Sequence, residues 1–149
     1  DLIDSNPSLT QLARVPAEIG RIEFKAFDSC GDFDLYASLS ALLKGLVIDQ
    51  TLKGRRTLPD ADWHQRSAQF GWMDEEMYRY AEGAIAAAKH ALMETGELLD
   101  CSLLKRLETV LEQHYCPAVK MTEAYKKGDS INQVLIEGYE QNLKVRCVA

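Results

Sequence analysis

The sequence contains few of the residues that cross-link a small protein through disulfide bonds or through a bound metal ion. Its 149 residues include four cysteines and three histidines. Cys30, Cys101, Cys116 and Cys147 lie far apart, form no C-x-x-C pair and have no histidine at a zinc-like spacing. This pattern favours neither a disulfide framework nor a structural zinc site.

Positive charge and long apolar runs are also scarce. The formal net charge is -6, which gives no general attraction to nucleic acid or to an anionic membrane surface. The apolar runs are far shorter than the ~20 residues of a membrane span, and the start, DLIDSNPSLTQ, lacks the features of a signal peptide. We therefore expect a soluble, cytoplasmic protein with no nucleic-acid or membrane partner, which holds any phosphate through local cations.

The remaining composition is that of a folded protein, with 46% hydrophobic and 27% charged residues. We expect residues 1–149 to form a single domain, in which residues 1–18, with Pro7 and Pro16, are an irregular lead-in. Most of the chain after residue 32 has the spacing of amphipathic helices. The predicted fold class is α+β, predominantly helical, with one strand at about residues 20–27 followed by five or so helices.

Apolar spacing and capping residues set the expected helices. Asp32 or Asp34 is expected to cap the first and Asp74 the second. Residues 53–63 are predicted to be a basic turn, followed by a short segment to Phe70. The predicted helical ranges are 33–52, 74–93, 102–115, 118–127 and a last helix that begins at 129 or 130. The apolar spacing predicts an inner face of Leu35, Leu39, Leu42 and Leu46 in the first helix, of Met77, Tyr78, Ala81, Ile85, Ala88 and Leu92 in the second, and of Leu104, Leu107 and Leu111 in the third. In the last helix the residues expected to face inward are Ile131, Val134, Leu135, Tyr139 and Leu143.

The stretch GRIEFKAFD, residues 20–28, is the clearest strand signal in the chain. Its alternation puts Ile22, Phe24 and Ala26 on one face and charged residues on the other. The charged residues are Arg21, Glu23 and Lys25.

Two interpretations of this charged face remain open from the residues alone. One face of an antiparallel sheet is commonly solvated, and alternation of this kind then needs no function. Alternatively, the face lines a site, with Glu23 as a ligand for a hard divalent cation and Arg21 and Lys25 as partners for phosphates that the cation bridges. The spacing suits a polyphosphate, since alternate residues on a strand are about 7 Å apart.

Residues 21–46, RIEFKAFDSCGDFDLYASLSALLKGL, favour the second interpretation through a resemblance. They resemble the strand, turn and helix of glutamine synthetases. They are still more similar to the glutamate–cysteine ligases of the bacterial carboxylate-amine ligase group, in which a G-x-[IV]-E-x-R-x-x-D strand precedes a helix rich in leucine and alanine. A glutamine synthetase fragment is the weaker match, because the helical tail after Gly45 does not resemble the ending of that family.

The resemblance assigns roles at four positions. It implies that Glu23 binds magnesium at the nucleotide phosphates, that Arg21 contacts phosphate, and that Lys25 contacts phosphate or the substrate carboxylate. Asp28 matches the pattern's aspartate, which we assign to shaping the turn. Lys25 stands where the pattern has arginine, so the charge is kept but the two-pronged geometry is lost.

The implied reaction is ATP- and magnesium-dependent formation of a γ-glutamyl amide from glutamate and an amine such as cysteine, through an acyl phosphate, as in glutathione biosynthesis. The chain would then be the C-terminal part of a larger glutamine synthetase-like catalytic domain. Its one strand would complete an antiparallel sheet supplied by a missing upstream part or a partner chain, and the isolated fragment would be inactive.

A rival hypothesis is a non-catalytic helical domain that docks another protein through its charged strand, because an unpaired strand readily accepts a partner strand.

Overall fold

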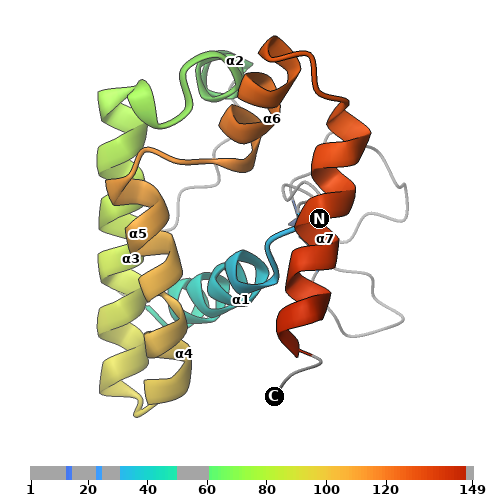
Figure 1. Ribbon diagram of the computed structural model, residues 1–149. Helices are drawn as coiled ribbons and strands as arrows, with labels where there is room; N and C mark the ends of the chain where they lie inside the picture. Colours follow the sequence, from blue (N-terminus) through green and yellow to red (C-terminus); the bar gives the residue numbers. More distant parts are fainter. Residues whose placement is uncertain (1–12, 15–22, 25–30, 50–60, 147–149) are drawn as a thin grey trace.

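The computed structural model describes residues 13–14, 23–24, 31–49 and 61–146, and this part of the chain is predominantly helical (Figure 1). The strands and the first helices are β1 (Ala13–Arg14), β2 (Glu23–Phe24), α1 (Phe33–Ile48), α2 (Ala61–Phe70) and the 3-10 helix η1 (Gly71–Met73). The remaining helices are α3 (Glu75–Glu94), α4 (Leu98–Leu103), α5 (Lys105–Glu112), α6 (Pro117–Lys126) and α7 (Ile131–Arg146).

The β-structure that the structure describes is a two-residue ladder. Strands β1 and β2 pair antiparallel, with Ala13 opposite Phe24 and Arg14 opposite Glu23. The rest of the strand predicted at about 20–27 lies outside the described residues. Ala13 and Arg14 correct the expectation that residues 1–18 are irregular throughout, and they show that β2 pairs within its own chain.

The hydrophobic core lies where α1 crosses α3 and the α4–α5 segment (Figure 1). Its buried apolar residues are Leu35, Ala41, Ile85, Ala88, Leu92, Leu104, Leu107, Val110 and Leu111. Ile85, Ala88 and Leu92 recur at the helical spacing that predicted the inner face of α3, and Leu104, Leu107 and Leu111 do so for the following segment. These predictions of the core faces are confirmed.

The inner face of α1 contains Leu35, as predicted, but small residues elsewhere instead of the other leucines that the apolar spacing predicts. Ser38, Ala41 and Gly45 are buried, whereas Leu39 and Leu42 are half-buried at its margin. A Cβ atom added to Gly45 would lie 2.6 Å from Ala88 Cβ, closer than two carbon atoms can pack. The absence of a side chain at Gly45 therefore allows α1 and α3 to cross closely.

Helix boundaries agree with the predictions where a local cap sets them. Asp74 accepts hydrogen bonds from the N–H groups of Glu76 and Met77, and α3 begins at Glu75 as expected. The helix expected at 102–115 is instead two helices, α4 and α5, which meet at Leu104. Leu104 is fully buried, so the break turns the chain without removing this side chain from the core.

Three further predictions need correction. Residues 61–70 form helix α2, because their weak apolar pattern does not prevent a regular backbone. Helix α1 ends at Ile48 with Asp49 in extended conformation, which is earlier than residue 52. In α7, Ile131 is 42% and Leu143 57% exposed. Helix α7 lies at the opposite side of the molecule from α3, and among the described residues it packs on α6 and on the turn before α1 (Figure 1).

Candidate functional site

The structure places only one of the predicted site residues. Glu23 lies in β2, and its backbone pairs with that of Arg14. Arg21, Lys25 and Asp28 lie outside the described residues, so the structure does not bring the charged face together. The assignment of Arg21, Glu23 and Lys25 to a site remains a prediction.

Arg14 is a charged position near Glu23 that the sequence did not predict. The two residues are direct register partners in the antiparallel ladder. Partners of this kind are the nearest cross-strand neighbours in a sheet. A two-residue strand is too short to form an alternating pattern, which explains why no sequence signal marks Arg14.

The turn that connects the charged strand to α1 is fixed at Asp32. This residue caps α1, with Oδ1 accepting a hydrogen bond of 2.9 Å from the N–H of Leu35. Its Oδ2 accepts from Arg106 of α5, at 3.2 Å from Nε and 2.5 Å from Nη2. One carboxylate thus ties the start of α1 to a helix more than seventy positions later in the chain.

The same turn also contacts α7. A Cβ atom added to Gly31 would lie 2.6 Å from the Cα and carbonyl carbon of Gly138 and 2.8 Å from the nitrogen of Tyr139. The rings of Phe33 and Tyr139 lie next to this contact, with centroids 5.8 Å apart. The backbones approach so closely here because neither Gly31 nor Gly138 has a side chain.

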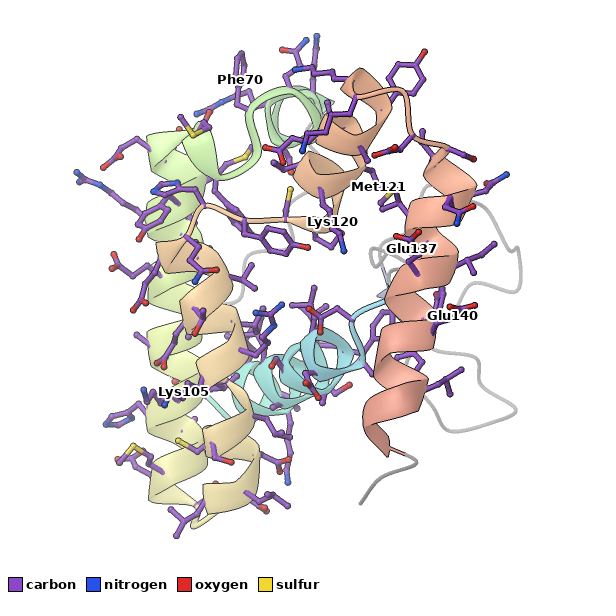
Figure 2. The ribbon with its side chains drawn as sticks, in the orientation of Figure 1. Phe70, Lys105, Lys120, Met121, Glu137 and Glu140 are labelled. Carbon is purple, nitrogen blue, oxygen red and sulfur yellow. The ribbon has the colours of Figure 1, made fainter. Side chains whose placement is uncertain are left out.

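A cavity of about 190 Å³ opens between this turn and helices α5, α6 and α7. Its polar lining includes Asp32, Arg106 and Lys120, and its apolar lining includes Met121 and Leu135. Figure 2 shows Lys120 extending from α6 into the space between α5 and α7, with Met121 beside it. The cavity therefore begins directly after the strand and turn that carry the family resemblance.

A second concave surface lies between η1 and α6, with a volume of about 370 Å³. Phe70 and Met73 line it and are 54% and 79% exposed. Trp72 also lines it and donates a hydrogen bond of 3.0 Å from Nε1 to the carbonyl of Tyr115. This bond links η1 to the segment before α6.

Neither a metal centre nor a membrane span is found in the part of the chain that the structure describes. Within residues 31–49 and 61–146, no three His, Cys, Asp or Glu side chains are grouped so that they could hold a metal ion. Over the same described ranges, no helix has the length and apolar character needed to cross a bilayer.

Comparison with protein-family models, curated proteins and solved structures found no match in any of the three. The resemblance over residues 21–46 therefore depends on the residues of that segment alone.

Proposed function

We propose that this chain is part of an ATP- and magnesium-dependent carboxylate-amine ligase, similar to glutamate–cysteine ligases, that forms a γ-glutamyl amide. The observation that carries the proposal is the pattern Arg21-x-Glu23-x-Lys25-x-x-Asp28, followed by a turn and a helix containing Gly45 and Leu46. The structure supports the second half of this pattern, since α1 begins at Phe33, directly after the turn.

Each charged residue of the strand has a distinct role in this proposal. The carboxylate of Glu23 is a hard oxygen ligand of the kind that magnesium prefers, and it would hold the ion at the nucleotide phosphates. Arg21 would bind phosphate oxygens, and Lys25 a phosphate or the substrate carboxylate.

The chemistry needs alignment and charge neutralisation more than a protein nucleophile. The γ-carboxylate of glutamate attacks the γ-phosphorus of ATP, ADP leaves, and an acyl phosphate forms. The amine then attacks the acyl carbon, loses a proton, and expels phosphate. Cations fixed on a rigid scaffold accelerate both steps, because charge builds up on phosphoryl and carbonyl oxygens.

The described contacts hold the residues at the start of α1 in a fixed position. Asp32 is held by Arg106, Gly31 packs on Gly138, and α1 is packed into the core through Gly45. These contacts join residues 31–32, directly before α1, to helices α5 and α7. The remaining carboxylates of the site would come from an upstream part of the protein or from a partner chain, so the isolated chain would not catalyse the reaction.

Calorimetric titration of the longest natural form of the protein with MgATP tests the proposal. We expect binding that weakens roughly tenfold or more in Glu23→Gln, since a ligand charge at the metal is lost. Glu137→Gln is the matched control, because Glu137 is an exposed α7 glutamate that accepts a hydrogen bond of 3.3 Å from Gln133 of the same helix.

Equal binding by wild type and Glu23→Gln would overturn the role of Glu23. No binding by the wild type would favour the rival hypothesis, a helical domain that docks a protein through the charged strand. Where binding is found, ATP-dependent condensation of glutamate with cysteine and with other amines identifies the acceptor.

A further inference from the structure

The cavity between the turn and helices α5, α6 and α7 carries a surplus of positive charge. Arg106 and Lys120 line it from two different helices, and among the lining residues that the structure describes Asp32 is the one acidic residue. This surplus contrasts with the chain as a whole, which carries a net charge of -6.

The positive charge that no described carboxylate in the lining balances is that of Lys120. Both oxygens of Asp32 are already engaged, one by the N–H of Leu35 and the other by Arg106. Arg106 and Asp32 therefore neutralise one another. For Lys120, no ion pair within 4.0 Å is found among the residues that the structure describes. A cavity that holds one uncompensated ammonium group attracts an anion.

The opposite wall of the cavity is apolar. Val134 and Leu135 of α7 are half-buried there, and Met121 of α6 also lines the cavity. Pockets for drug-sized ligands are roughly 300–1,000 Å³, so a cavity of about 190 Å³ suits a smaller molecule. An apolar wall favours an organic anion over an inorganic one, because only the former has apolar surface to bury.

We propose that this cavity binds a small aliphatic carboxylate, with the carboxylate on Lys120 and the free edge of Arg106 and the hydrocarbon part on Met121, Val134 and Leu135. The described residues that line the proposed site include none from β2, and the proposal goes beyond the ligase function. It would hold a second, separate ligand at the turn that continues the strand into α1.

NMR titration of the isotope-labelled protein with 3-methylbutanoate tests this inference without ATP or magnesium. We expect saturable shifts of the Gly31, Leu135 and Gly138 amide signals, and roughly tenfold weaker binding in Lys120→Gln, because a charge-assisted hydrogen bond is lost. Lys127→Gln is the control, since Lys127 is an exposed lysine next to the end of the same helix and outside the cavity lining.

Two further probes decide what the cavity recognises. The uncharged 3-methylbutanamide is expected to bind more weakly than the acid, and inorganic phosphate to cause smaller shifts than the acid. The proposal is overturned by the absence of saturable shifts, by equal binding in Lys120→Gln, or by an equal response to the amide or to phosphate. None of these outcomes bears on the MgATP titration of Glu23→Gln, so failure of one proposal is distinguishable from failure of the other.

Discussion

At the scale of single residues, Asp74 combines two stabilising roles in one carboxylate. It caps α3, and it receives hydrogen bonds of 2.8 Å from both Nε and Nη2 of Arg66. Desolvation raises the pKa of Asp74, but the hydrogen bonds from Arg66 and from the backbone N–H groups of Met77 and Glu76 outweigh it. The pKa therefore lies below its ordinary value of 3.8.

This lowered pKa predicts an acid-dependent loss of stability. Because the pKa is lower in the folded than in the unfolded protein, the stabilisation is fully present above the unfolded value and is lost as the pH falls through the folded value. We expect Asp74→Asn to lower the urea midpoint at neutral pH, and the difference from wild type to disappear as the pH falls through the lowered pKa of Asp74.

The control for this measurement is Glu75→Gln, which removes a carboxylate from the same helical turn. Glu75 pairs with Arg79 at the surface, where both side chains are about three-quarters exposed, so its loss changes the midpoint little. A difference between Asp74→Asn and wild type that stays constant across the pH range would contradict the assignment.

At the scale of elements, the sequence predicts those structural features that neighbouring residues determine, and not those that depend on contacts between distant segments. The cap at Asp74 and the inner face of α3 follow from neighbouring residues, and both were predicted. The Arg106–Asp32 pair joins residues that no local pattern relates. The division between α4 and α5 also left no signal, since Leu104 and Leu107 continue an apolar spacing across it.

The same distinction between local and distant causes applies to the residues of the candidate site. The alternation predicts a charged strand at about 20–27, of which the structure describes only Glu23 and Phe24. The register partner Arg14 and the cavity residue Lys120 depend on how distant segments meet. Lys120 belongs to an exposed turn of α6, where a lysine has no sequence feature that distinguishes it from any other surface lysine.

The crossing of α1 and α3 gives a prediction at this scale. Gly45→Ala would place a methyl group 2.6 Å from Ala88 Cβ, so the helices must move apart. We expect a loss of roughly 1–3 kcal/mol in the free energy of unfolding, although alanine favours helix more than glycine does.

Gly83→Ala is the matched substitution on α3 itself. A Cβ atom at Gly83 would meet nothing within 4 Å, so only helix propensity acts there, and we expect a gain of about 0.5–1 kcal/mol. Urea unfolding of both variants measures the contrast. If Gly45→Ala also stabilises the protein, the close crossing of α1 and α3 is wrong.

At the scale of the whole molecule, the helices form two parts of unequal packing. The buried residues belong to α1, α3, and the α4–α5 segment, and in α6 and α7 no residue with described burial is fully buried. Regions with few buried apolar contacts open at a lower free energy than the core does. The walls of the proposed carboxylate site that α6 and α7 provide are therefore expected to open at a lower free energy than the core.

Hydrogen exchange measured by mass spectrometry tests this division. We expect the amides of α3 to exchange most slowly and those of α7 to exchange by local opening at a lower free energy.

The variant Gly31→Ala should increase the difference in exchange rate between α7 and α3. Its methyl group would lie 2.6 Å from the backbone of Gly138 and would force α7 away from the turn. Exchange in α7 would then accelerate while α3 stays protected. Gly83→Ala, which touches neither part of this contact, should leave α7 unchanged, and an equal acceleration of α3 and α7 in Gly31→Ala would show that the molecule unfolds as one unit instead.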